Sequence, residues 1–205
     1  MDISPSKRRI LDEALKLFAV NGYEATSIEQ ITNAVGIKKA SLYSHFKSKK
    51  EILDLLVDEI KEQYQLYLER MLKDFEMTED NFKEDIEWDE EYIFKFVKSQ
   101  FKFLISDPFF SKVRNFLTIE QFRNPILASL QNQCEYIDAL NYKKLIQFLV
   151  EKGIFIDKGI EIMAYEFFSP INVQFYHIQR EPSCEEEALR IVEEHIKHFF
   201  RIYSR

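Results

Sequence analysis

The chain of 205 residues is poor in the residues that interrupt helices, because it contains only four glycines and five prolines. Its two cysteines, Cys134 and Cys184, match no metal or redox spacing, which favours reduced thiols in a cytoplasmic protein over a disulfide. No run of 18 apolar residues occurs, and no apolar segment follows the charged start of the chain. We therefore expect neither a membrane-spanning helix nor a signal peptide.

Sustained alternation of apolar and polar residues is also missing, so the sequence does not predict strands. Apolar residues make up 46% of the chain, which is enough to bury a substantial core. We therefore predict an all-α fold.

Negative charge is missing from one stretch of an acidic chain. Between Glu29 and Glu51 there is no acid, although the net charge is −7, and five lysines surround the run SLYSHF at residues 41–46. Residues 1–53 carry nine basic and six acidic side chains, a net charge of +3, which leaves −10 for residues 54–205. A polyanion is the partner that this local basic excess fits, although a solvated helix face would give the same count.

Helix signals precede this stretch. Ser4 and Pro5 are typical of an N-cap and first helical position, and apolar residues recur at helical spacing as far as Gly22, so the first helix is expected over residues 5–21. Thr26 and Ser27 each precede a glutamate or glutamine by three residues, the spacing of a capping box. A short second helix is therefore predicted to end at Gly36.

A third short helix is expected over residues 38–44, after the turn at Gly36. Leu42 and Phe46 are four residues apart and would anchor it, which leaves a polar outer face. This face comprises Lys38, Lys39, Ser41 and Tyr43. The plan is that of a helix-turn-helix, whose second helix enters the major groove of DNA.

The long fourth helix is predicted to begin after Ser48, which with Glu51 forms another capping box. The backbone N–H groups of its first turn and the ammonium of Lys49 are suited to binding a phosphate. This helix is expected to continue to about Phe75, and at 1.5 Å per residue it would span about 40 Å.

Residues 8–53 resemble the DNA-binding domain of the TetR family of bacterial transcriptional regulators. The turns NGYEATS and AVGI, the run LYSHF and the helix start SKKEIL all fall in register, over about a quarter of the chain. The resemblance implies DNA-backbone contacts from Thr26 and Ser27, groove contacts from Lys38, Lys39, Ala40, Ser41 and Tyr43, and phosphate contacts from His45 and Lys49. Lys38 stands where capping chemistry favours a small hydroxyl.

A structural alternative stays open for several of these residues. Tyr43 could be part of the core, and His45 could merely pack beside Phe46. Lys47 and Lys50 are better explained as solvated side chains than as bound ones.

The sequence divides into a helix-turn-helix domain at residues 4–64, with its motif near residues 27–46, and a helical effector-binding and dimerisation domain at residues 65–205. Residues 76–91 carry nine acids and are expected to form a solvated loop, with cation binding as the alternative. Residues 92–105 are apolar on most sides and predict a central helix. Asp107 with Pro108, and Asn124 with Pro125, indicate two further helix starts.

Two amphipathic helices are predicted at the end of the chain, the first with a kink at Pro170 and the second capped by Ser183 with Glu186. The family resemblance implies that these helices pair with their twins in a homodimer. The candidate interface residues lie on the two apolar stripes, namely Ile160, Met163, Phe167, Ile171, Ala188, Ile191, Val192, His195 and Phe199.

An apolar effector pocket is a further expectation, since the chain has 19 phenylalanines and 10 tyrosines, although core packing could absorb them. The candidate lining residues are Gln100, Phe101, Leu104, Phe116, Cys134, Phe168, Asn172 and Tyr176. A small lipophilic or aromatic effector fits this composition. A lipophilic cation is the alternative, because aromatic faces attract cations.

These features predict a ligand-responsive repressor that binds a palindromic operator in double-stranded DNA as a homodimer. An activator of the same family, or a helical protein-interaction module, remains the alternative. An enzyme is the weakest interpretation, because no phosphate loop, GxSxG turn or HExxH helix occurs. His195 and His198 lack a third metal ligand at a defined spacing, so a packed histidine is favoured, and no cofactor, metal or catalytic residue is predicted.

Overall fold

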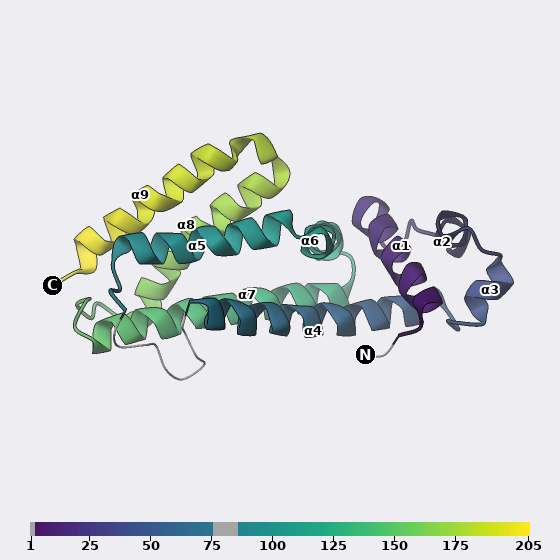
Figure 1. The fold of residues 1–205 in the computed structure, drawn as a ribbon, viewed down its shortest axis with the longest axis horizontal. Coiled ribbons are helices and arrows are strands. Elements are labelled where there is room, and N and C mark those ends of the chain that lie inside the picture. Colours follow the sequence, from purple (N-terminus) through teal and green to yellow (C-terminus); the bar gives the residue numbers. More distant parts are fainter. Residues whose placement is uncertain (1–2, 76–85) are drawn as a thin grey trace. The chain divides into compact units, whose positions relative to one another are not determined.

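The computed structural model describes residues 3–75 and 86–205, and these residues form helices without strands, apart from one isolated bridge between Phe155 and Ser204. The helices are α1 (Pro5–Asn21), α2 (Ile28–Val35), α3 (Lys39–Tyr43), α4 (Lys49–Asp74), α5 (Glu90–Ser106), α6 (Pro108–Glu120), α7 (Pro125–Glu151), α8 (Ile160–Arg180) and α9 (Glu185–Tyr203), with a 3-10 turn at Pro182–Cys184 (Figure 1). The all-α prediction is confirmed. Within the described ranges, no helix is long and apolar enough to cross a bilayer.

Contacts divide the chain into two compact units. The first comprises Met1–Glu69 and Asp107–Gln133, and the second comprises Arg70–Ser106 and Cys134–Arg205. Each unit is therefore assembled from two separate stretches of sequence, and α6 packs with the N-terminal helices. The functional boundary between residues 64 and 65 stays a prediction.

The N-terminal unit has a core shared by its first helices. Leu11 and Phe18 of α1 and Ile31 of α2 are fully buried, and so are Leu42 and Phe46 of the third helix and the turn that follows it. Each such side chain contributes about 1.5–3 kcal/mol through burial of apolar surface. The predicted anchoring of the third helix by Leu42 and Phe46 is therefore confirmed.

Helix ends in this unit follow the capping signals. Ser4 accepts a hydrogen bond from the Lys7 N–H, and α1 ends at Gly22, whose φ of +84° is costly for other residues. Gly36 ends α2 in the left-handed conformation, and its N–H donates to the Thr32 carbonyl over 2.9 Å.

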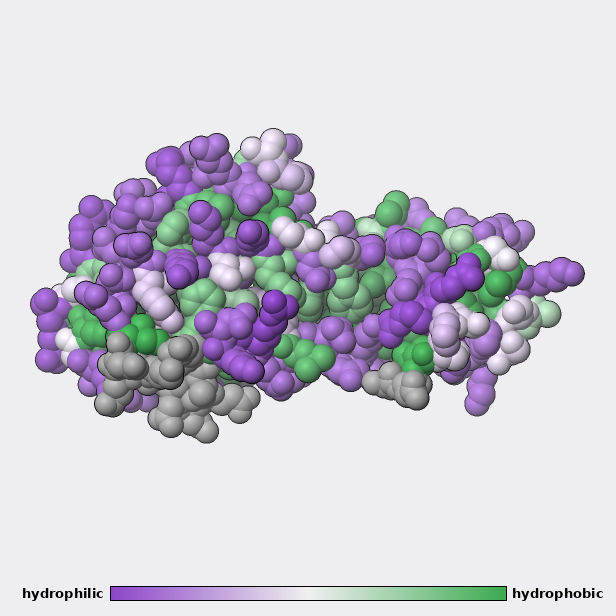
Figure 2. All heavy atoms as spheres, viewed as in Figure 1, coloured by the Kyte–Doolittle hydropathy of each residue, from purple (hydrophilic) through white to green (hydrophobic). Residues whose placement is uncertain are grey.

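The second unit is built around α5, α8 and α9. Ile93, Phe96, Val97 and Phe101 form the buried face of α5. Lys95, Lys98 and Lys102 lie on its exposed face, as predicted. On the molecular face shown in Figure 2, hydrophilic residues predominate, with smaller hydrophobic areas between them.

The start of α9 and the end of the predicted acidic loop differ from what the sequence predicts. Ser183 does not cap α9, because its hydroxyl donates to Glu181 and a 3-10 turn intervenes before the helix begins at Glu185. Most of the predicted acidic loop, residues 76–85, lies outside the described residues. Beyond it, Trp88 is buried against Tyr92 and Phe148 rather than solvated.

Candidate nucleic-acid interface

The outer face of α3 combines positive charge with hydroxyl groups. Lys39, Ala40 and Ser41 are exposed, as is Lys38 at the start of the helix. Tyr43 is 48% exposed, which contradicts the alternative that it belongs to the core. Ammonium and hydroxyl groups are suited to phosphate oxygens and base edges, so this face can contact DNA without disturbing the core beneath it.

The start of α3 has no side-chain cap, as the lysine at that position predicts. Lys38 adopts an extended conformation and its carbonyl accepts from the Ser41 N–H over 2.9 Å. Its ammonium is therefore not needed to close the helix. It is available to a ligand.

Ser27 forms a complete capping box with Gln30 at the start of α2. Its Oγ accepts from the Gln30 N–H over 3.1 Å, and the Gln30 side chain accepts from the Ser27 N–H over 2.7 Å. The exposed hydroxyl still has its own hydrogen to donate to a phosphate.

Thr26 has a structural role instead of the DNA-backbone contact that the family resemblance implied. Its side chain is 0% exposed, and its hydroxyl donates to the Gly22 carbonyl over 2.8 Å. The hydroxyl therefore closes the turn between α1 and α2 and cannot reach DNA in this conformation.

Lys49 is also engaged inside the protein. Its ammonium donates to the carbonyls of Tyr23 over 2.8 Å and Thr26 over 3.0 Å, with Glu24 at 3.4 Å, and it lies 4.3 Å from the centre of the Tyr23 ring. These contacts use the hydrogens that a phosphate would need. The predicted phosphate contact is corrected to a bridge between α4 and the turn before α2.

The residues around the start of α4 divide between bound and solvated side chains. Ser48 accepts from the Glu51 N–H over 3.1 Å, while Glu51 accepts from the Lys47 N–H over 2.6 Å, one residue earlier than a capping box requires. Lys50 pairs with Asp54 at the exposed surface, which agrees with a solvated role. His45 is half-buried beside the buried Phe46.

Glu120, at the end of α6, is a functional candidate that the sequence did not reveal. Its side chain is 2% exposed, and its Oε1 accepts from the Tyr23 N–H over 2.8 Å. The two residues are 97 positions apart, so no local spacing could have related them.

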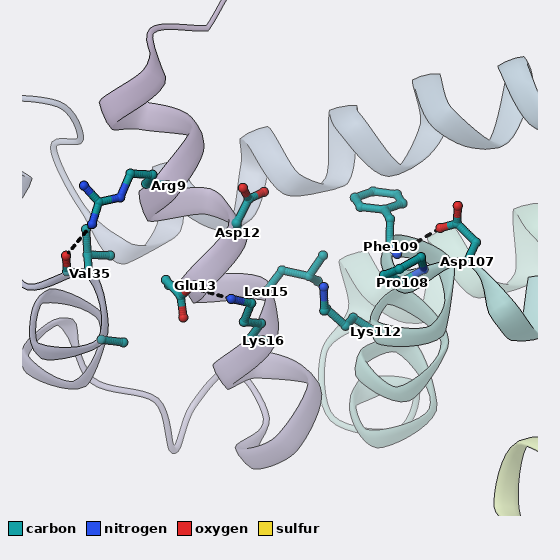
Figure 3. Close-up of a pocket in the computed structure, with 11 residues that line it drawn as sticks. Arg9, Asp12, Glu13, Leu15, Lys16, Val35, Asp107, Pro108, Phe109 and Lys112 are labelled. Carbon is teal, nitrogen blue, oxygen red and sulfur yellow. Dashed lines mark hydrogen bonds and ion pairs between the residues drawn. The ribbon is translucent and has the colours of Figure 1, made fainter.

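A cleft of about 430 Å³ lies in the same unit between α1, the end of α2 and the start of α6 (Figure 3). Arg9 crosses from α1 to donate to the Val35 carbonyl over 3.0 Å, and Lys16 pairs with Glu13. The lining mixes charges of both signs, so it selects no single charge type. Its clearest function is structural, because Arg9 holds the end of α2 against α1.

The predicted effector residues do not form one set. Phe116 belongs to the N-terminal unit, where it is buried and its ring stacks on Phe18 with centroids 5.4 Å apart. Its role in an effector pocket stays a prediction. The other seven lie in the second unit on α5, α7 and α8. These are Gln100, Phe101, Leu104, Cys134, Phe168, Asn172 and Tyr176.

Polar pairs connect the helices that carry these seven residues. The Tyr142 hydroxyl of α7 donates to Gln100 over 2.7 Å, and Tyr176 donates to Glu135 over 2.8 Å. Burial raises the pKa of the Cys134 thiol to about 12, with Asp138 and Glu135 acting in the same direction. Cys134 is therefore a protonated apolar neighbour and not a reactive thiolate at neutral pH.

The predicted dimer residues largely serve the core of a single chain. Six of them are buried within it, so they are unavailable to a second copy: Met163, Phe167, Ile171, Ala188, Val192 and Phe199. Ile160 and Ile191 are partly exposed. The Nε2 atom of His195 lies 3.0 Å from the Phe167 carbonyl oxygen. This contact supports the interpretation of His195 as a packed histidine.

Another face of α8 remains apolar and exposed. Ile162, Tyr165 and Val173 are 60%, 55% and 58% exposed. A shallow groove beside Tyr165 is also lined by Tyr136 and Leu140 of α7. The sequence did not indicate this face, because the helical spacing of the buried apolar residues of α8 is the more regular pattern.

Comparison with known proteins agrees with the geometry of the N-terminal helices. Residues 10–56 match the family model of bacterial regulatory proteins of the tetR family. The biofilm operon icaADBC HTH-type negative transcriptional regulator IcaR of Staphylococcus aureus (strain Newman) is 50% identical over 48 residues, which are 23% of this chain and 26% of that protein. The match thus spans about a quarter of that relative. IcaR of Staphylococcus epidermidis is 24% identical over 152 residues, 74% of each chain.

Solved structures share the fold over nearly the whole chain. A transcriptional regulator from Saccharomonospora viridis in complex with choline has a TM-score of 0.69 at 20% identity, covering 99% of this chain and all of that one. The fatty acid degradation regulator FadR from Bacillus halodurans has a TM-score of 0.69 at 17% identity, with 98% and 97% coverage. A SmeT–triclosan complex has a TM-score of 0.67 at 17% identity, with 98% and 93% coverage.

Proposed function

This chain belongs to the TetR family of bacterial transcriptional regulators, and we propose that it is a repressor that binds a palindromic operator as a homodimer. We further propose that a small lipophilic or aromatic effector controls its binding to DNA. The observation that carries the proposal is the outer face of α3, where Lys38, Lys39, Ser41 and Tyr43 are exposed above the buried Leu42.

The proposed interface has two kinds of contact. Lys38, Lys39, Ser41 and Tyr43, with the small side chain of Ala40 between them, would lie in the major groove. Ser27 and His45 would contact phosphates on either side of it. Thr26 and Lys49 support this interface from inside the protein.

The small size of α3 supports the proposal of a homodimer. A helix of five residues has few contacts with which to select a sequence, whereas two copies related by a twofold axis double those contacts and require a palindrome. We place the dimer surface on the exposed apolar residues of α8, Ile162, Tyr165 and Val173. Water-exposed apolar side chains gathered on one helix face favour burial against a partner.

Known relatives support the proposed direction of control and the proposed class of effector. Repression is favoured because the IcaR relatives are negative regulators. Choline and triclosan accompany two proteins of the same fold, and triclosan, an aromatic molecule, is of the effector class proposed here. The polar pairs Tyr142–Gln100 and Tyr176–Glu135 would give such a ligand hydrogen-bonding partners.

A footprint on the DNA that flanks the protein's own gene tests this proposal. We expect a protected inverted repeat, with an affinity that falls as salt rises because counterions are released. Replacing Tyr43 by alanine should weaken binding without unfolding the protein, since the side chain is half-exposed. Absence of tight binding to any duplex at low salt would reject the proposal.

Repressor and activator are separated by a reporter placed behind the protected site. Expression should rise when the regulator is deleted if it represses, and fall if it activates. Restoring wild-type protein should reverse the change, while the Tyr43→Ala protein should not.

A further inference from the structure

We propose that Glu120 and Lys49 form a clamp on the turn between α1 and α2, and that Glu120 is a positioning residue for DNA binding although it does not touch DNA. The turn comprises residues 22–26, and the clamp is the pair of side chains that hold it from α6 and α4. This inference rests on the proposed function, because the consequence of the clamp is operator affinity.

Opposite charges hold the two peptide groups that flank Tyr23. The Glu120 carboxylate accepts from the Tyr23 N–H over 2.8 Å, and the Lys49 ammonium donates to the Tyr23 carbonyl over 2.8 Å. Hydrogen bonds to ionised groups are stronger than those between neutral groups. The backbone at Tyr23 is therefore fixed more firmly than the internal hydrogen bonds of a surface turn would fix it.

The surroundings of Glu120 are built to admit its carboxylate. The side chain is 2% exposed, and burying a carboxylate is costly unless it has hydrogen-bond donors. Gly22 has no side chain, and a Cβ atom there would lie 2.7 Å from Glu120 Oε1. Apolar packing alone would not select a glutamate at this position, whereas capture of a backbone N–H does.

The turn leads directly into the DNA-binding helices. Thr26 closes it through the Gly22 carbonyl, and the next residue, Ser27, is the N-cap of α2. The orientation of α2, and of α3 behind it, therefore depends on where the turn is held. Contacts to base edges require well-defined distances, so releasing the turn should reduce specific binding more than non-specific binding.

Three variants test the clamp: Glu120→Gln keeps an acceptor without the charge, Glu120→Ala removes both, and Lys49→Met removes the ammonium. Glu13→Gln is the matched control, because it removes one negative charge from a partly exposed side chain of the same unit. Operator and random-sequence affinities are measured by fluorescence anisotropy at a temperature where circular dichroism shows each variant folded.

We expect Glu120→Ala to lose about tenfold in operator affinity, which corresponds to about 1.4 kcal/mol, and to keep its affinity for random DNA. Glu120→Gln should lose less, and Lys49→Met should resemble Glu120→Ala. The operator affinity of the Glu120→Ala, Lys49→Met double variant should fall by less than the product of the two single fold-losses, because both side chains hold the same turn. Operator affinity of folded Glu120→Ala equal to that of Glu13→Gln would overturn the proposal.

Salt dependence separates the clamp from a direct phosphate contact of Lys49. Loss of one phosphate contact would reduce the slope of log affinity against log salt by about 0.9. We expect the slope of Lys49→Met to equal that of wild type, and a reduction of that size would overturn the role of Lys49.

Hydrogen exchange at the Tyr23 amide provides a readout that does not depend on DNA. Exchange should be faster in Glu120→Gln and faster still in Glu120→Ala, and unchanged in Glu13→Gln. Unchanged exchange in both Glu120 variants would overturn the clamp even if wild type binds its operator. Failure of wild-type protein to bind any operator would instead reject the proposed function. If Glu120→Ala does not fold, the operator affinity and the Tyr23 amide exchange of Glu120→Gln test the proposal in its place.

Discussion

At the scale of single residues, His195 shows how packing sets the charge of a side chain. Burial lowers the pKa of its imidazole below the ordinary value of 6.5, while the hydrogen bond with the Phe167 carbonyl acts in the opposite direction and the charge of His198 adds to the lowering. Its ring also packs beside those of Phe167 and Phe199, with centroids 5.9 and 6.3 Å away. The folded chain therefore favours the neutral ring.

This has a predictable consequence for stability. Because the folded-state pKa of His195 is lowered, the unfolded chain takes up its proton at a higher pH than the folded chain does. The free energy of unfolding should therefore fall as pH drops from about 7 through the ordinary histidine range towards the lowered value. Denaturant titrations of wild type and His195→Gln would measure it.

The variant should lose part of this pH dependence, whereas His198→Gln, which changes an exposed neighbour, should retain most of it. Identical pH dependence in wild type and His195→Gln would contradict a neutral, packed His195.

Residues whose role depends on local periodicity were predictable from the sequence. Leu42 and Phe46 are buried, as their spacing of four residues predicted, whereas the sequence left the exposure of Tyr43 open. Thr26, Lys49 and Glu120 were not predictable in the same way. Their roles depend on where α1, α4 and α6 bring a single turn, and residue type alone makes Thr26 and Lys49 equally suitable for DNA contact.

At the scale of elements, capping chemistry located most helix starts. Asp107 accepts from the N–H groups of Phe109 over 2.9 Å and Phe110 over 3.0 Å, so it caps α6 as predicted. Ser183 carries the same kind of signal and caps nothing, because the 3-10 turn at Pro182–Cys184 delays the start of α9. A capping motif identifies a helix start, but the geometry of the preceding turn decides whether the side chain is used.

This contrast predicts unequal effects of two similar substitutions. Asp107→Ala should lower the free energy of unfolding by about 1 kcal/mol, because two helix N–H groups lose their acceptor. Ser183→Ala should change it by less than about 0.5 kcal/mol, as expected for a surface site. Chemical denaturation measures both, and equal losses would contradict the assignment of the caps.

At the scale of the whole molecule, the proposed dimer uses a surface that sequence periodicity did not reveal. The apolar stripes of α8 and α9 were visible in the sequence. Such a stripe indicates that a helix face is buried, but it does not indicate whether the same chain or a second copy covers that face. Phe167 of α8 packs against Phe199 of α9 within one chain, with ring centroids 5.0 Å apart, and Val192 is buried in the same chain. The exposed residues of α8 are left for a partner.

Charged substitutions on that face should therefore separate the dimer. Tyr165→Glu with Val173→Glu should yield a protein with the mass of one chain in sedimentation equilibrium, since the two positions are 55% and 58% exposed and can be changed without opening the core. The operator affinity of this variant should also fall, because a single chain contacts only one half of the palindrome. Leu66→Glu, at a 51% exposed position on α4, is the control and should leave the mass unchanged. A folded double variant that remains dimeric would place the interface elsewhere.

Selection of duplexes from a random library tests directly whether α3 selects the operator sequence. Wild-type protein should enrich one inverted repeat. A Lys39→Ala, Ser41→Ala variant should recover sites with altered base preferences at symmetric positions in both halves, because both residues are exposed on the outer face of α3. Enrichment of no sequence by wild type at low salt, or recovery of the same site with the same preferences by the variant, would contradict this role of α3.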